Sequence, residues 1–360
     1  MTADGHPVRV RALRATLLAH YDRHRRDLPW RRTRDPYAIW VSEVMLQQTR
    51  VETVVPYYLR FLERFPTVAS LAEAPAERVH AAWSGLGYYR RARLLHEGAR
   101  TVVRDCGGVL PSDRKALLAL PGIGTYTSGA IASIAFGLPA PAVDGNVERV
   151  LTRVFALAGA PEREPTHTRI ATIAARLADS DRAGDVNQAL MELGATVCTP
   201  ASPACDRCPW TSECAARSLG QTGRFPERRA RATRSVERWT ALVATDRAGK
   251  HVWLQPGTGA RWAGMLLPPM REGRARTVWD GAPRPLPTRT CGSVVHVLTH
   301  RSLDVAVVRG TLAGVPQGGE LVQLDALHDR PLPAITRRIL ACAKLAEPSD
   351  RHGRARSLRG

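Results

Sequence analysis

The stretch from Leu120 to Val150 holds residues whose types and spacing could do chemistry. Gly122 and Gly124 stand on either side of one isoleucine, between two apolar helical runs, and Asp144 follows in the segment VDGNV. Two such close glycines indicate a tight turn with uncovered backbone amides, and amides at the start of the following helix can bind a phosphate. Asp144 is expected to cap a further helix. A phosphate site beside a lone carboxylate favours an enzyme that works on nucleic acid.

Four of the seven cysteines fall within one short segment, with the spacing C-x6-C-x2-C-x5-C. Thiols this crowded in a cytoplasmic protein are expected to ligate metal rather than to pair as disulfides. Zinc usually has two close cysteine pairs, and only one is present here, whereas four thiolates around a compact loop also suit a 4Fe–4S cluster. The predicted ligands are Cys198, Cys205, Cys208 and Cys214.

The composition bounds the class of protein and its partner. The 360 residues are 44% hydrophobic, enough for two domains with real cores, and no stretch approaches the roughly 18–20 unbroken apolar residues of a membrane span. The N-terminus is a poor secretory signal, so we expect a cytoplasmic, nucleoid-associated protein. A net charge of +19 favours a polyanionic partner. Only three of the 52 basic residues are lysines, so genome composition also contributes to this charge.

The elements that must position these residues are helical up to about residue 216. We expect no strand in this region, because apolar residues recur there with helical rather than alternating spacing. Ser42 precedes one helical pattern, which places Glu43 in a first turn where the helix dipole favours a carboxylate. Glu43 is open to interpretation as a helix-start carboxylate or as a catalytic group. The other expected helices cover 8–24, 67–83, 90–104, 115–120, 128–136, 147–157, 166–177 and 186–193.

Two short basic and aromatic segments are candidates for nucleic-acid contact. In GLGYYRRAR, two glycines expose Leu86 and Tyr88 beside arginines, which fits stacking on bases and binding of phosphates. A tight turn between helices explains the same residues. Arg31, beside Trp30, is either a contact to DNA or part of a packed turn.

The pattern changes after the cysteines. Residues 217–237 are polar and arginine-rich and are expected to form a linker. Strand-type alternation then predicts a smaller, mostly β domain over 238–345, and the basic end, 346–360, is expected to be disordered.

Together these motifs resemble the helix-hairpin-helix DNA glycosylases of the endonuclease III superfamily. Within it, WVSEVMLQQTRVETVVPYY, GLGYYRRARLLH and NQALMELGATVCTP are similar to the MutY-type adenine DNA glycosylase family. The resemblance implies a mainly α catalytic region, 1–216, with a six-helix module at about 30–137 and an iron–sulfur module built from 1–29 and 138–216. It also implies one 4Fe–4S cluster and a small C-terminal α+β domain with a Nudix (MutT-like) fold.

The resemblance assigns roles to individual residues. Glu43 matches the acid that protonates adenine, and Asp144 matches the carboxylate that stabilises the oxocarbenium-like sugar. Tyr126 and Asn146 match supporting positions. Tyr126 also stands where lyases of the superfamily carry a Schiff-base lysine, so a monofunctional enzyme is expected.

The DNA contacts follow from the same match, because the target base must leave the helix stack. Gly122 and Gly124 would hold a phosphate through their amides. The residues matched to the gap or wedge beside 8-oxoguanine are Gln48, Leu86 and Tyr88. The implied partner is double-stranded DNA with adenine opposite 8-oxoguanine or guanine, bound by a monomer.

The segment HVLTH in the C-terminal domain matches a family pattern, H-x-F-S-H, that recognises 8-oxoguanine. Thr299 and His300 would make the hydrogen bonds, while Leu298 replaces the usual aromatic residue, which puts the strength of recognition in doubt. The alternative interpretation of this segment is a plain half-buried strand. No Nudix box is present in the sequence, so pyrophosphohydrolase activity is not expected.

Two other functions compete with an adenine glycosylase. One is a pyrimidine-damage glycosylase with lyase activity, which the missing lysine disfavours. The other is a non-catalytic, cluster-bearing DNA-binding or redox-sensing module, which the presence of both Glu43 and Asp144 disfavours.

Overall fold

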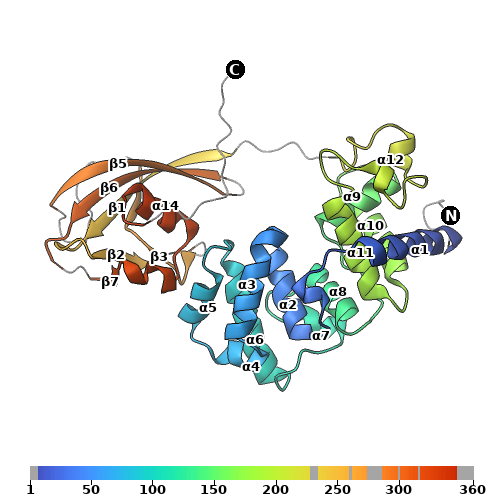
Figure 1. Ribbon diagram of the computed structural model, residues 1–360, viewed down its shortest axis with the longest axis horizontal. Helices are drawn as coiled ribbons and strands as arrows, with labels where there is room; N and C mark the ends of the chain where they lie inside the picture. The colour runs from blue at the N-terminus through green and yellow to red at the C-terminus, as the bar shows by residue number, and fades with distance from the viewer. Residues whose placement is uncertain are drawn as a thin grey trace. The chain divides into compact units, whose positions relative to one another are not determined.

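The computed structural model describes residues 7–227, 234–258, 262–273, 286–298, 301–314 and 317–346. Helices fill the chain up to residue 218, and the strands all follow residue 234 (Figure 1). Two predictions lie outside the described residues: the lesion contacts of Thr299 and His300, and the disordered tail beyond 346. None of the described helices is long and apolar enough to cross a membrane.

The helices of the first part occupy nearly the ranges that the apolar spacing predicts. They are α1 Pro7–His24, α2 Pro36–Leu46, α3 Val51–Arg64, α4 Val68–Glu73, α5 Ala76–Trp83, α6 Arg90–Asp105, α7 Arg114–Leu118, α8 Thr125–Ile134, α9 Gly145–Val154, α10 Thr166–Ala178, α11 Ala183–Thr196 and α12 Ala215–Ser218.

The predicted start of the helix that carries Glu43 is wrong. Asp35 caps α2 by accepting hydrogen bonds from the amides of Tyr37 and Ala38, each at 3.2 Å, and Pro36 occupies the first helical position. The helix ends at Leu46. Glu43 therefore lies in the last turn of α2, where the helix dipole opposes negative charge instead of favouring it.

The single helix predicted over 67–83 is two helices, α4 and α5. Pro75 lies directly before α5 and cannot continue a preceding helix, since it lacks an amide hydrogen and restricts the residue before it. The apolar pattern runs through this break because Leu71 and Val79 are both buried. Periodicity alone does not register such an interruption.

Contacts between Cα atoms divide the chain into two units. The helical unit comprises Met1–Glu73 and Leu94–Ala230, and the sheet unit comprises Ala74–Arg93 and Arg231–Gly360. Residues 74–93 join the sheet unit through hydrogen bonds near its C-terminal helix. The Ser84 hydroxyl donates to the carbonyl of Leu332 at 2.9 Å and accepts from the Arg337 guanidinium at 2.8 Å.

One apolar core of the helical unit gathers the two ends of its chain. Residues of α1 pack with those of α9, α10 and α11, and Trp210 from the cysteine segment is fully buried among them. The Trp210 indole donates to the carbonyl of Leu13 at 2.9 Å. Phe225, within the predicted linker, belongs to this core as well.

The sheet unit has a mixed sheet. Its strands are β1 Ser235–Thr245, β2 His251–Pro256, β3 Leu266–Leu267, β4 Met270–Glu272, β5 Leu286–Val297, β6 Arg301–Thr311 and β7 Glu320–Gln323. The order is β3-β2-β1-β6-β5, with β4 on β1 and β7 on β2. The pair β1 and β6 is parallel, with Ser235 opposite Arg301 and Thr245 opposite Thr311, and the other pairs are antiparallel.

Helix α14, Ala334–Cys342, packs on β5 and β1 (Figure 1). A helical part followed by an α+β part with a mixed sheet is the predicted fold class. The last three residues of the predicted linker, 235–237, already belong to β1.

Candidate active site and cysteine loop

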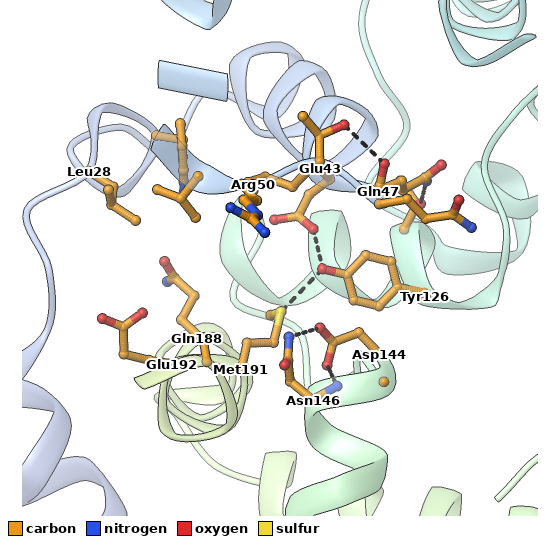
Figure 2. Close-up of a pocket in the computed structure, with 18 of the residues that line it drawn as sticks. Leu28, Glu43, Gln47, Arg50, Tyr126, Asp144, Asn146, Gln188, Met191 and Glu192 are labelled. Carbon is orange, nitrogen blue, oxygen red and sulfur yellow. Dashed lines mark hydrogen bonds between the residues drawn. The ribbon is translucent and has the colours of Figure 1, made fainter. Parts of the chain in front are cut away.

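A pocket of about 790 Å³ opens in the helical unit, and its walls come from segments far apart in the chain. Figure 2 shows Glu43, Tyr126 and Asp144 side by side in it, with Met191 and Asn146 beneath Tyr126. The volume is in the range of pockets that take one small organic group. The sequence predictions for Glu43, Tyr126, Asp144 and Asn146 thus converge on one cavity.

Glu43 projects into this pocket from the last turn of α2 and is 5% exposed. Burial raises the pKa of Glu43 to about 7, the hydrogen bond from Tyr126 and the charge of Arg31 lower it, and the charge of Asp144 raises it. The end of α2 adds to the upward direction. Glu43 is thus protonated in a large fraction of molecules near neutral pH, as a general acid must be.

Asp144 caps α9 and keeps its carboxylate in the pocket. One oxygen accepts from the amides of Asn146 at 3.0 Å and Val147 at 2.8 Å, and the other accepts from the Asn146 side-chain amide at 2.7 Å. Three N–H donors at a helix N-terminus favour a negative charge. The predicted cap is confirmed, and the same bonds fix the direction of the carboxylate.

Tyr126, in the first turn of α8, lies between an acid and a thioether. Its hydroxyl contacts the Glu43 carboxyl and lies 3.1 Å from the sulfur of Met191 (Figure 2). Burial raises the pKa of Tyr126, and the nearby charges of Glu43 and Asp144 raise it further. The phenol therefore keeps its proton.

An ion-paired carboxylate forms another wall. Glu192 of α11 accepts from Arg26 at 2.7 Å and from Arg31 at 2.8 Å. Burial raises the pKa of Glu192, but the two arginines overcome it and hold the pKa at about 2. The Arg31 side chain is only 10% exposed and also lies over the ring of Tyr21. These contacts match the packed turn, and Arg31 lines the pocket, while its contact with DNA stays a prediction.

Sequence reasoning missed the contribution of α11 to this pocket. Gln188, Met191 and Glu192 all line it (Figure 2). A signal was present, because positions three and four apart lie on one helix face. That face of α11 carries two polar residues and a methionine, whereas a face that only packs in a core is expected to be apolar.

The hairpin before α8 has the predicted glycine geometry. Gly122 has φ +78°, and a Cβ there would also lie 2.8 Å from the Cβ of Leu94, so only glycine fits. Gly124 is the N-cap of α8. The first backbone amides of α8 have no hydrogen-bond acceptor within the helix. They lie beside the pocket, because Gly124 and Thr125 line it.

The three predicted base contacts differ in exposure. Gln48 is exposed and has φ +57°, in the turn after α2. Tyr88 is 50% exposed with φ +48°, whereas Leu86 is buried with 6% exposed. The turn thus presents Tyr88 and packs Leu86.

The four clustered cysteines line one small cavity of the helical unit, and none of the four is paired in a disulfide. Burial, together with the other three cysteines and against a backbone hydrogen bond from Trp210, raises the pKa of Cys208 to about 11, so the four sulfurs lie close enough to influence one another. Among the described residues, however, no three His, Cys, Asp or Glu side chains converge tightly enough for one metal ion.

Arg153 of α9 ties the cysteine segment to the core. It is 2% exposed and donates to the carbonyls of Thr199 at 2.7 Å and Pro200 at 2.9 Å. Its Nη1 lies 3.4 Å from the sulfur of Cys198, and its Nε donates to Phe225 at 2.9 Å. Arg153 thus holds the cysteine segment against α9 through buried hydrogen bonds.

Comparison with known proteins places this geometry in a family. Residues 41–176 match the model of the HhH-GPD superfamily base excision DNA repair proteins. An adenine DNA glycosylase of Mycolicibacterium smegmatis is 46% identical over 205 residues, which cover 57% of this chain and 69% of that protein. The chain belongs to the MutY-type adenine DNA glycosylase family.

Longer members of the family match over a smaller share of their length. The human adenine DNA glycosylase is 52% identical over 217 residues, covering 58% of this chain and 40% of the human protein. The rat protein is 50% identical, with 44% of its length covered. The chain thus spans less than half the length of these curated relatives.

Solved structures agree on the fold. A thermostable thymine-DNA glycosylase is 33% identical, with a TM-score of 0.54, over 58% of this chain and 97% of that one. A trapped endonuclease III–DNA covalent intermediate is 22% identical with a TM-score of 0.51, which shows the helix-hairpin-helix fold alone. The predicted membership and fold class are confirmed.

Proposed function

We propose that this protein is a monofunctional adenine DNA glycosylase that removes adenine opposite 8-oxoguanine, and also opposite guanine, in base excision repair. One observation carries the proposal. A buried carboxyl group with a pKa of about 7, Glu43, shares a pocket with a carboxylate that three N–H donors hold, Asp144. Two carboxyl groups with opposite protonation are what glycosidic hydrolysis requires.

In the proposed reaction Glu43 first donates a proton and later accepts one, while Asp144 stabilises a positive charge. Glu43 donates its proton to a ring nitrogen of adenine as the bond from the sugar to the base breaks, and the bonding electrons leave with the base. Asp144 stabilises the oxocarbenium-like sugar. Water then adds to the sugar carbon and returns a proton to the Glu43 carboxylate, which restores the acid.

Tyr126 supports a hydrolytic rather than a lyase mechanism. Its buried phenol stays protonated and has no amine with which to form a Schiff base. The sequence contains three lysines, and none lines the pocket. The relative named a thymine-DNA glycosylase makes a T:G duplex the informative second substrate.

The proposed DNA contacts come from the exposed turns. Gly122 and Gly124 leave the first amides of α8 for a phosphate, independent of sequence, while Gln48 and Tyr88 meet the bases beside the extruded adenine. Thr299 and His300 remain the proposed contacts to 8-oxoguanine. We expect a monomer that acts on the nucleoid in the cytoplasm.

We further propose that Cys198, Cys205, Cys208 and Cys214 hold one 4Fe–4S cluster. A single zinc ion would draw its thiolates to about 2.3 Å from one point, whereas a cluster has its irons between more widely spaced sulfurs. Four thiols that line one cavity of the helical unit can surround such a cluster. With all four ligands closed, the cluster would have a structural role.

The function is tested with duplexes that contain A:8-oxoguanine, A:G or T:G, each read with and without alkali. We expect strand breaks mainly after alkali, on the first two duplexes only, and a loss of at least about a hundredfold in Glu43→Gln, as for removal of a general acid. Equal cleavage without alkali would favour the lyase. No base release at all would favour a DNA-binding module.

The cluster is tested by iron and sulfide analysis of anaerobically purified protein. We expect about four irons per chain and a brown colour, both reduced in Cys208→Ser, and no change in Cys106→Ser, which lies outside the loop. Zinc without iron would overturn the assignment.

A further inference from the structure

The Tyr126 hydroxyl has one hydrogen to donate but two hydrogen-bond acceptors next to it. Its hydroxyl is within hydrogen-bonding reach of the Glu43 carboxyl and lies 3.1 Å from the sulfur of Met191. A phenol donates one hydrogen and accepts others, and a thioether sulfur is a weak acceptor only. Tyr126 can therefore donate to Glu43 or to Met191, but not fully to both.

The choice depends on the protonation of Glu43. When Glu43 is ionised, it needs a donor, and the Tyr126 hydroxyl donates to it. When Glu43 is protonated, its own O–H can donate to the tyrosine oxygen, and the tyrosine hydrogen is then left for Met191. Only the second arrangement uses the thioether, so the sulfur stabilises the acid form of Glu43.

We propose that Met191 is a positioning residue that acts through Tyr126 to keep Glu43 protonated. The inference rests on the proposed function, since it concerns the acid of that reaction. In the acid form the hydrogen on Glu43 turns to the tyrosine oxygen, and the hydrogen on Tyr126 turns to the sulfur. When adenine takes the proton of Glu43, the Tyr126 hydrogen turns back and donates to the carboxylate that remains. Met191 touches neither reacting atom in this scheme.

Other charged groups face Glu43 and set the background for this effect. Asp144, at the start of α9, favours the acid form, and Arg31, before α2, favours the carboxylate. Arg26, Arg50 and Glu192 also line the pocket, and Glu192 is committed to its two arginines. None of these groups contacts the Met191 sulfur in the described bonds, so a change at Met191 leaves them in place.

The test replaces the sulfur without changing the size of the side chain much. Met191→Leu removes the acceptor, and Met191→Gln supplies an amide oxygen in its place. Difference infrared spectra in the absence of DNA, with Glu43→Gln subtracted, isolate the Glu43 carboxyl stretch during a pH titration. We expect the midpoint to fall by about half a unit to one unit in Met191→Leu and to recover in Met191→Gln. Met270→Leu, in the sheet unit, serves as the matched control and should leave it unchanged.

Single-turnover kinetics give a second readout. The ratio of rates at about pH 6 and about pH 8 should rise severalfold in Met191→Leu and return toward the wild-type ratio in Met191→Gln. An unchanged midpoint in Met191→Leu, or a rate that falls equally at both pH values, would overturn the proposal. Because the infrared titration uses no substrate, it stands or falls separately from the glycosylase assignment.

Discussion

The environment of the Glu43 carboxyl group is unlike that of a surface carboxyl, because the side chain is buried. The folded protein binds its proton up to about pH 7, while an unfolded chain releases it near 4.5. The folded state thus holds more protons between these two pH values, and stability falls as the pH rises through that window. The burial that keeps Glu43 protonated for catalysis therefore lowers the free energy of unfolding at higher pH.

A neutral amide at position 43 should therefore stabilise the fold. We expect Glu43→Gln to raise the free energy of unfolding above about pH 7 by up to about 3 kcal/mol, since each unit of pKa shift corresponds to about 1.4 kcal/mol. Below about pH 4.5 the gain should vanish. Urea unfolding of both proteins across this range measures it, and equal stabilities at high pH would refute it.

The sequence predicts Asp144 better than Glu43 at this scale. Asp144 has its donors within three residues, so VDGNV contains the whole capping signal. Glu43 depends on burial by distant segments and on a helix start at Asp35, seven positions earlier than the serine that suggested one. The role came from the family motif, and the local electrostatics inferred from the first turn had the wrong sign.

At the scale of elements, α11 determines how the pocket is closed. Glu192 joins this helix to Arg26 and Arg31 in the segment between α1 and α2, and its side chain is 8% exposed. Removing one partner of such a buried pair leaves the others uncompensated. These ion pairs of Glu192 hold the wall of the pocket in place and also contribute to stability.

We expect Glu192→Gln to destabilise the helical unit by about 3 kcal/mol at neutral pH. The pKa of Glu192 is depressed, so its contribution is present above about pH 4.5 and is lost as the pH falls toward 2. The difference between the two proteins should shrink in acid. Glu213→Gln, which removes a half-exposed partner of Arg9, is the control and should change stability by less than about 1 kcal/mol. Thermal melts at several pH values decide the matter.

Helix α8 crosses the segment that leads to Asp144 at very close range. A Cβ on Gly129 would lie 2.0 Å from the carbonyl oxygen of Pro141, and Asn187 ties the same segment down by accepting from the amide of Ala142 at 3.1 Å. We expect Gly129→Ala to cost about 3 kcal/mol, because backbone must move. Gly145→Ala, with open space around its Cβ, should be neutral or slightly stabilising in the same denaturation assay. Equal effects would contradict this account.

Sequence patterns predict the helices of this region but not which of their side chains meet in the pocket. Apolar spacing marks α9 and α11, and an unbroken buried run marks α8. It does not report that α11 supplies Met191 to the site of Glu43, since the two lie far apart in the chain. Such contacts follow from how closely packed helices cross, and that depends on glycines such as Gly184 of α11, where a Cβ would lie 2.6 Å from the carbonyl oxygen of Ser133 in α8.

For the whole molecule, the exit of the chain from the helical unit is held in place. Phe225 is 6% exposed in the core, and its carbonyl accepts from buried Arg153. We expect Phe225→Ala in the full chain to destabilise the helical unit by about 3–4 kcal/mol. Leu219→Ala, at a side chain that is 58% exposed, should change it by less than about 0.5 kcal/mol. Hydrogen exchange in α1 and α9 localises the loss, and protection equal to wild type would speak against the role of Phe225.

The sequence predicted a polar linker across this part of the chain because the charges of its arginines dominate the composition. Phe225 nevertheless holds this part of the chain in the core. Burying its ring contributes more to the free energy of folding than the exposed arginines around it do. The change from helical to alternating spacing, in contrast, marks where the strands begin, but not that residues 74–93 belong to the sheet unit. Its parallel pairing of β1 with β6 joins strands too far apart for local patterns to report.

The burial of Glu43 also has a consequence for timing. A group that holds its proton to about pH 7 carries it before DNA arrives, so the first turnover draws on a proton that the enzyme already possesses. Its rate should then be insensitive to buffer concentration at fixed pH. Later turnovers need no delivery from solvent either, because the attacking water reloads the same carboxylate.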